Sequence, residues 1–144
     1  ADPTIETALI IAPATLKLNW KRELERWLVR PREIAVISSD EVPENAQVVI
    51  VNEERLKNGV LAALQSRRFD VLIADECHRL KNPKAQRTQK VLGGRKSKAD
   101  GLIARARRVL ALTGTPIPNR PIELLCGRLP GSVGLAFRRR EPPR

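Results

Sequence analysis

The sequence contains no methionine and no tyrosine, and its aromatic residues are two tryptophans and two phenylalanines. Because no methionine stands at position 1, we expect that the chain does not begin at a natural start and is a fragment of a longer protein. Its 144 residues are enough for one domain with a hydrophobic core and too few for two.

Cysteines and long apolar runs are also scarce, and each scarcity excludes a class of protein. Cys77 and Cys126 lie far apart, without the paired spacing of zinc sites. No apolar run approaches the roughly 20 residues that a transmembrane helix needs. Because no secretory signal is visible either, the pattern predicts an intracellular protein of the cytoplasm, nucleoid or nucleus, with no membrane partner.

Acidic residues are few in the last third of the chain, so the net charge of +11 is unevenly placed. Residues 1–92 hold 15 Lys/Arg and 13 Asp/Glu, a balance of +2, whereas residues 93–144 hold 12 and 3, a balance of +9. This asymmetry favours an anionic partner, with nucleic acid first. A solvated basic surface or a disordered tail explains such charge runs about equally well.

Apolar strands alternate with helices through residues 1–126, which we interpret as one domain. The predicted strands are 8–12, 33–37, 48–51, 71–74 and 109–112, and the predicted helices include 20–28, 53–65 and 83–92. Strands that are apolar throughout indicate an α/β fold whose parallel sheet has helices on both faces. Residues 127–144 are rich in glycine, proline and arginine and are predicted to be a poorly ordered basic tail.

Two adjacent acids directly follow a predicted strand in the stretch VLIADECHRLKNPKAQRTQ. In this position Asp75 can hold Mg²⁺ through water, because hard cations prefer oxygen ligands and keep several waters. Its neighbour Glu76 can orient or deprotonate the water that attacks a γ-phosphate. An acidic turn after a strand, with His78 as an ordinary solvated residue, is the alternative.

The segment Leu112-Thr113-Gly114-Thr115-Pro116 follows the last predicted strand in the same way. Its hydroxyls are short donors, and its glycine lets the backbone approach a neighbour closely. A simple turn after a strand also explains it. Ligands of parallel sheets lie at the carboxyl ends of the strands, so two such segments about 40 residues apart favour one shared site.

The two segments together resemble a known family. IADECHRLKN resembles the DEAH-type second motif of helicase superfamily II, and LALTGTPIPNRPIELL resembles its third. LIIAPATLKLNWKRELERWL and VVIVNEERL are similar to segments of Swi/Snf-type DNA-dependent ATPases, and the resemblance spans roughly residues 8–125 in order. It implies part of the first RecA-like lobe of a P-loop NTPase that couples ATP hydrolysis to movement on double-stranded DNA.

The resemblance also implies roles for individual residues. Asp75 would hold Mg²⁺ through water, Glu76 would activate the attacking water, and His78 would link the nucleotide site to the third motif. The residues that couple hydrolysis to DNA movement would be Thr113, Gly114 and Thr115. Those that match the family's first DNA-contact segment are Lys17, Asn19 and Trp20, and Trp20 also fits a core position on the apolar face of its helix.

The sequence departs from the family in two ways that matter for function. Glu53 stands where the family usually has an aromatic residue. The P-loop pattern G-x-x-x-x-G-K-[ST], which the family places before strand 8–12, is absent from the chain. We therefore expect the isolated chain to be inactive, with ATP and Mg²⁺ bound in an intact parent that supplies the P-loop segment and a second RecA-like lobe. The alternatives are a non-enzymatic DNA-binding module and a truncated remnant.

Overall fold

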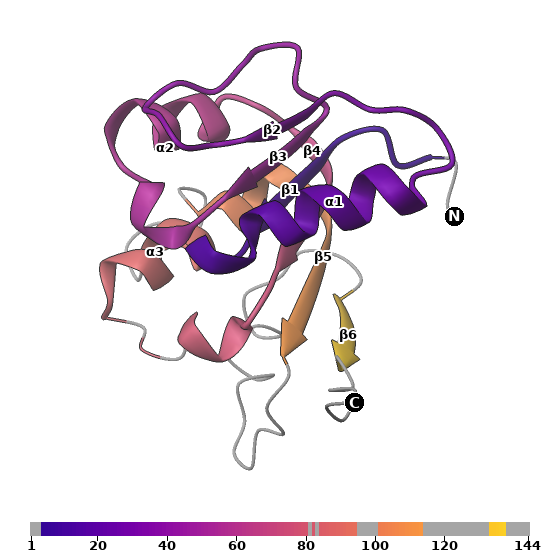
Figure 1. The fold of residues 1–144 in the computed structure, drawn as a ribbon. Coiled ribbons are helices and arrows are strands. Elements are labelled where there is room, and N and C mark those ends of the chain that lie inside the picture. Colours follow the sequence, from indigo (N-terminus) through magenta and orange to yellow (C-terminus); the bar gives the residue numbers. More distant parts are fainter. Residues whose placement is uncertain (1–3, 81, 83, 95–100, 114–132, 138–144) are drawn as a thin grey trace.

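The computed structural model describes residues 4–80, 82, 84–94, 101–113 and 133–137 (Figure 1). Six strands form one sheet in the order β2-β3-β1-β4-β5-β6, and every neighbouring pair is parallel. The strands are β1 (Ala8–Ile11), β2 (Ile34–Val36), β3 (Val48–Val51), β4 (Phe69–Ala74), β5 (Ala106–Thr113) and β6 (Val133–Phe137). The predicted α/β fold with a parallel sheet is confirmed.

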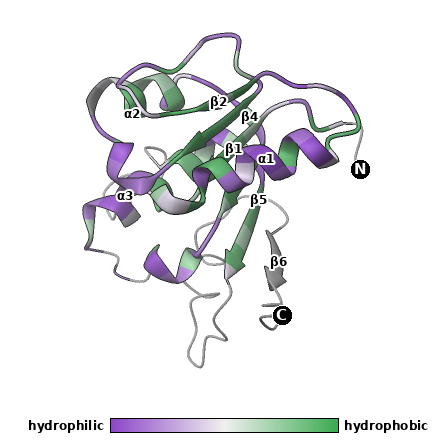
Figure 2. Ribbon diagram, viewed as in Figure 1, coloured by the Kyte–Doolittle hydropathy of each residue, from purple (hydrophilic) through white to green (hydrophobic). Residues whose placement is uncertain are grey.

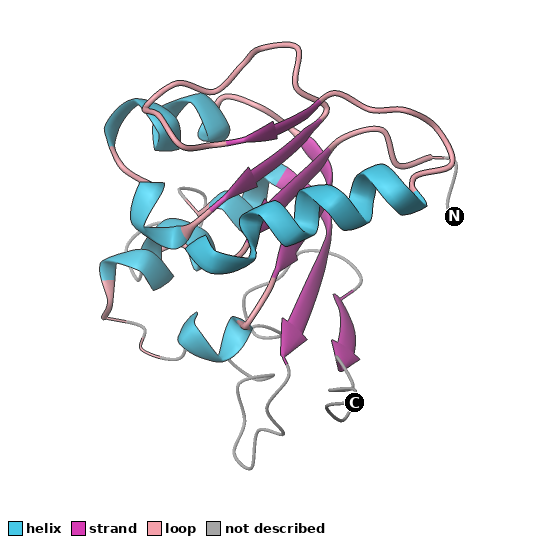
Figure 3. Ribbon diagram, in the orientation of Figure 1, coloured by secondary structure: helices cyan, strands magenta, loops and turns pink. Residues whose placement is uncertain are grey.

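Helices and single 3-10 turns lie between β1 and β2, between β3 and β4, and between β4 and β5, whereas a loop joins β2 to β3 (Figure 3). The helices are α1 (Lys17–Trp27), α2 (Asn58–Gln65) and α3 (Gln86–Leu92). The 3-10 turns are η1 (Ala14–Leu16), η2 (Glu53–Arg55), η3 (Cys77–Leu80) and η4 (Leu102–Arg105). Among the residues described, no helix has the length and apolar character needed to span a lipid bilayer.

The central strand β1 is buried on both faces because successive side chains point to opposite sides of the sheet. Leu9 and Ile11 belong to a core cluster that includes residues of α2 and α3. Ile10 and Ala12 belong to a second cluster, against which Trp20 and Leu24 of α1 pack. Helices therefore cover both faces, and Figure 2 shows strands β1, β3 and β5 mainly in the green of hydrophobic residues.

Two segments differ from what the periodicity predicts. The single helix predicted over 53–65 is split into η2 and α2, because Lys57 between them has an extended backbone with φ −132° and ψ 155°. Trp27 lies on the predicted apolar face of α1 but is 68% exposed. Its indole N–H donates to Glu23 Oε2 over 2.9 Å, and the Arg26 guanidinium lies 5.1 Å from its ring centroid.

The described part of segment 127–144 is β6, which adds a parallel edge strand to β5 with Ala111 opposite Leu135. No strand was predicted in this segment from the sequence. Cys126 and most of the segment lie outside the described residues. The division of the chain at residue 126 therefore stays a prediction.

The segment that leads into β1 is anchored by Asp70, a residue of β4. Asp70 Oδ2 accepts hydrogen bonds from the backbone N–H groups of Glu6 and Thr7, each over 2.9 Å, and from Thr7 Oγ1 over 3.1 Å. These bonds, the backbone N–H of Thr7 first, lower the pKa of Asp70 below its ordinary value of 3.8. The charged carboxylate thus ties the N-terminal segment to the sheet.

Asp70→Asn is expected to lower the free energy of unfolding at neutral pH by about 2 kcal/mol, the usual contribution of hydrogen bonds to a charged group. Because the folded pKa is lowered, the stabilisation is complete above 3.8 and is lost as the pH falls through the folded value. Urea unfolding of both proteins at neutral and acid pH measures it. A difference that persists undiminished in acid would contradict this account, and Asp40→Asn, at a side chain 91% exposed, is the control.

Candidate nucleotide-hydrolysis site

The acidic pair and Thr113 lie at the carboxyl ends of the neighbouring strands β4 and β5. Ala74, the last residue of β4, is opposite Ala111 of β5, and the Asp75 N–H continues the ladder by donating to Ile11 O over 2.8 Å. Asp75 is 5% exposed and Thr113 is 1% exposed. The strand order thus brings together residues 38 positions apart (113 − 75) at the edge where parallel sheets bind ligands.

Asp75 is held by a residue of α1. Its Oδ2 accepts the indole N–H of Trp20 over 2.8 Å, and its Oδ1 accepts the backbone N–H of Glu76 over 2.9 Å. Each carboxylate oxygen has a further lone pair, so both can still accept a bond from a water molecule. A carboxylate of this kind fits Mg²⁺ bound through water. Within the described ranges, no group of three His, Cys, Asp or Glu side chains gathers as a metal site.

Glu76 has a backbone φ of 51°, the one positive φ among the described residues other than glycine. Such a conformation costs on the order of 1–3 kcal/mol and clusters at functional sites. Its Oε2 is buried and lies 3.1 Å from His78 Nδ1, but accepts no hydrogen bond from any part of the chain that the structure describes. This oxygen therefore keeps its capacity to accept a proton or a hydrogen bond from water.

His78 stands between the acidic pair and Thr113. The same ring nitrogen, Nδ1, lies 3.1 Å from Glu76 Oε2 and 3.5 Å from Thr113 Oγ1, the second distance being long for a hydrogen bond. Whether this nitrogen donates a hydrogen bond or accepts one from the Thr113 hydroxyl depends on the tautomer. The geometry brings the two motifs within reach of one imidazole, and the coupling role of His78 stays a prediction. Gly114 and Thr115 lie outside the described residues.

The three residues predicted to contact DNA have different surroundings. Lys17 Nζ donates to Ile37 O over 2.6 Å and to Asn52 Oδ1 over 2.9 Å, and burial lowers its pKa, with the Arg55 charge as the next cause. Trp20 is half-buried and binds Asp75 as described above, whereas Asn19 is exposed. Two of the three therefore have partners inside the protein, and DNA contact stays a prediction for all three.

Two features of the site were not predicted from the sequence. One is the bond between Trp20 and Asp75, and the other is a cluster of charged residues around Glu53 at the end of β3. A signal for the second was present, since Glu53 is an acid that follows a fully buried strand with one residue, Asn52, between them. Cys77 is 3% exposed, and burial raises the pKa of its thiol, with Glu76 and Asp75 as further causes. Cys77 is therefore a core residue rather than a nucleophile.

Residues 2–126 match the model of the SNF2-related domain family. The chain is 33% identical over 119 residues to the Xenopus tropicalis "SWI/SNF-related matrix-associated actin-dependent regulator of chromatin subfamily A-like protein 1". It is 33% identical over 124 residues to the human "DNA repair and recombination protein RAD54B". It is 33% identical over 125 residues to the mouse "DNA annealing helicase and endonuclease ZRANB3".

Among solved structures, the chain is similar to the Sulfolobus solfataricus SWI2/SNF2 ATPase core in complex with dsDNA, with a TM-score of 0.65 and 23% identity. The match covers 83% of this chain and 23% of that one, and it shows a shared fold. Each of the three curated relatives is matched over 81% of this chain, and the match spans 11% to 12% of the length of each relative.

The matched residues contain both motif segments and the helix that carries Trp20, so the resemblance read from residues 8–125 is confirmed. The chain belongs to the SNF2-related domain family.

Proposed function

We propose that the chain is part of the first RecA-like lobe of a DNA-dependent ATPase and that it carries the metal and water side of the ATP site. The observation that supports this is the grouping of Asp75, Glu76, His78 and Thr113 at adjacent strand ends. P-loop and second-lobe residues would come from other parts of the protein.

The proposed chemistry divides the work between the two acids. Bound Mg²⁺ would neutralise the charge that develops on the phosphates of ATP. Asp75, fixed by Trp20, would accept hydrogen bonds from a water on the metal. Glu76 Oε2, which accepts no hydrogen bond within the described residues, would orient the attacking water and take its proton. His78 would couple changes at Glu76 to Thr113, because its Nδ1 lies 3.1 Å from Glu76 Oε2 and 3.5 Å from Thr113 Oγ1.

Duplex DNA is the proposed partner. The excess of positive charge in residues 93–144 favours a polyanion, and the similar archaeal ATPase core is described in complex with dsDNA. The names of the curated relatives place those proteins in chromatin regulation and DNA repair. On this basis we also propose an intracellular protein that acts on DNA, in the nucleus if its source has one.

Hydrolysis of ATP by the full-length protein that contains this chain tests the proposal. We expect a rate that rises when duplex DNA is added and a DNA affinity whose logarithm falls linearly with the logarithm of salt concentration. Phosphate release with and without duplex, across a salt series, measures both. DNA binding without any hydrolysis would overturn the enzymatic proposal in favour of a DNA-binding module, and the absence of both would favour a remnant.

A further inference from the structure

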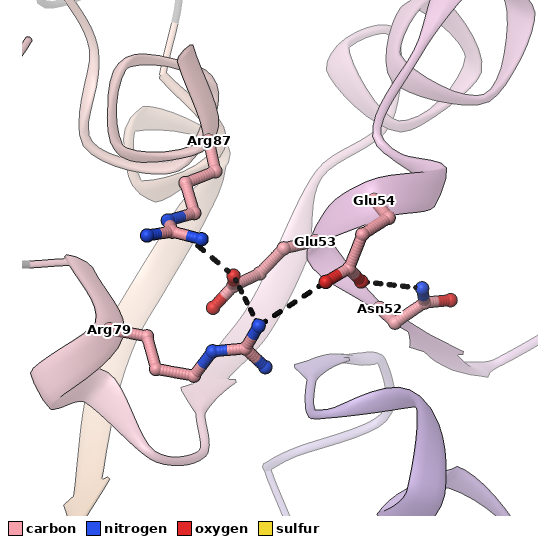
Figure 4. A network of polar contacts seen from close by, with 5 residues as sticks. All are labelled: Asn52, Glu53, Glu54, Arg79 and Arg87. Atoms are coloured by element: carbon pink, nitrogen blue, oxygen red, sulfur yellow. Dashed lines mark hydrogen bonds and ion pairs between the residues drawn. The ribbon is translucent and has the colours of Figure 1, made fainter. Parts of the chain in front are cut away.

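The end of β3 carries a cluster of charged and polar side chains, shown in Figure 4, that the proposed chemistry does not use. We call it the β3 clamp, and its members are Asn52, Glu53, Glu54, Arg79 and Arg87. Asn52 and both glutamates come from the end of β3 and from η2, whereas the arginines come from η3 and α3. The clamp thus joins the end of β3 to two consecutive elements that lie 25 or more residues further along the chain.

Glu53 is the buried member of the clamp. Its side chain is 4% exposed, and its Oε2 accepts no hydrogen bond within the described residues. The nearest charges to Oε2 are Arg79 Nη2 at 3.6 Å and Arg87 Nε at 3.9 Å. Burial raises the pKa of Glu53, and the two guanidinium groups oppose that shift. A buried carboxylate costs free energy unless charges face it, so Glu53 favours conformations that keep its arginines in place.

Arg79 connects this carboxylate to the candidate site. Its Nη2 also donates to Glu54 Oε1 over 3.2 Å, so one guanidinium nitrogen is shared by two acids. Arg79 directly follows His78 in η3, a turn of four residues. Because the two residues are consecutive in this short turn, its backbone links the position of Arg79 to the imidazole that lies between Glu76 and Thr113.

The other end of the clamp reaches α1. Asn52 Nδ2 donates to Glu54 Oε2 over 2.7 Å, and Asn52 Oδ1 accepts the ammonium of Lys17 over 2.9 Å. An unbroken series of polar contacts therefore runs from the first residue of α1, through the end of β3, to the turn that holds His78.

We propose that Glu53 is a positioning residue that holds Arg79, and through it the imidazole of His78, in register with Glu76 and Thr113. Its importance for hydrolysis rests on the function proposed above, whereas the placement of His78 does not.

His78 is the only histidine in the chain, so its imidazole gives a single set of NMR resonances that reports the placement of η3. We would record these resonances for the chain without a histidine tag and for Glu53→Gln, Arg79→Lys and the double variant. Arg79→Lys keeps the charge but replaces the planar guanidinium, whose Nη2 faces both acids, with a more flexible ammonium group. We expect both single variants to move the His78 Hε1 resonance by more than its line width, with the double variant showing less than the sum of the two shifts.

Arg87→Lys is the matched control, because Arg87 also faces Glu53 but belongs to α3 rather than to η3. We expect little movement of His78 in this variant. The proposal is overturned if the His78 Hε1 resonance does not move in Arg79→Lys, or if it moves as far in Arg87→Lys as in Arg79→Lys. It is also overturned if the shift in the double variant equals the sum of the two single shifts. Far-UV circular dichroism confirms that each variant is folded.

Hydrolysis by the full-length protein separates this proposal from the function on which it rests. We expect Glu53→Gln and Arg79→Lys to lower the DNA-stimulated kcat by a factor of about 2 to 30, the usual range for residues that couple sites. A wild-type protein that hydrolyses no ATP, together with the expected His78 shifts, overturns the proposed function and supports the clamp. Normal hydrolysis in Arg79→Lys with an unmoved His78 overturns the clamp alone.

Discussion

Glu76→Gln is expected to lower the rate of ATP hydrolysis by the full-length protein by a factor of about 10²–10⁴, the usual contribution of a general base. Glutamine keeps the size of the side chain and accepts hydrogen bonds, but it cannot take a proton from water. Glutamate and glutamine have side chains of the same shape, so the cost of the positive φ of 51° at position 76 is the same in both proteins. The turn is therefore preserved in the variant.

The expected signature of Glu76→Gln is a loss of kcat with ATP binding and duplex binding unchanged. Phosphate release at saturating ATP and DNA measures the first, and equilibrium titration with a labelled nucleotide and duplex measures the others. Glu44→Gln, at an exposed glutamate in the loop that leads into the amino end of β3, is the control and should hydrolyse ATP like the wild type. Equal rates in the two variants would remove Glu76 from the chemistry.

The order of strands and helices was predictable from the sequence because buried strands of parallel sheets are apolar throughout. The five predicted strands correspond to β1 to β5, with ends that differ by no more than a few residues. The edge strand β6 was not predicted, because the run Val133–Phe137 contains a glycine and follows a segment rich in glycine and proline. Its pairing with β5 is a contact that local pattern does not encode.

The candidate site was predictable only where its residues directly follow strands. Asp75, Glu76 and Thr113 satisfy that condition, and the strand-end rule for parallel sheets placed them at one edge. The bond from Trp20 to Asp75 depends on β1 and β4 being neighbours, which follows from the strand order and not from the sequence near either residue. The ion pair between Glu53 and Arg79 was not predictable from the nearby sequence either, because η2 and η3 meet only after the sheet has formed.

Leu72→Ala is expected to lower the free energy of unfolding of the chain by about 2–5 kcal/mol, the usual range for removing a buried leucine side chain. Leu72 is 0% exposed and lies on β4 between Leu9 of β1 and Val109 of β5. All three belong to one core cluster, so the cavity left by the truncation has ordered neighbours on both sides that cannot collapse freely.

The loss of stability in Leu72→Ala bears on the candidate site because β4 ends directly before Asp75 and Glu76. Domains are stable by only about 5–15 kcal/mol, so losing 2–5 kcal/mol at Leu72 removes a large share of the total. Urea unfolding followed by circular dichroism should show a lower midpoint with an unchanged slope, because the variant exposes nearly the same surface on unfolding. Leu18→Ala on α1, at a residue 62% exposed, should change the midpoint little. Equal midpoints for the two variants would mean that β4 does not lie in the core, and the strand-end position of Asp75 and Glu76 would lose its structural basis.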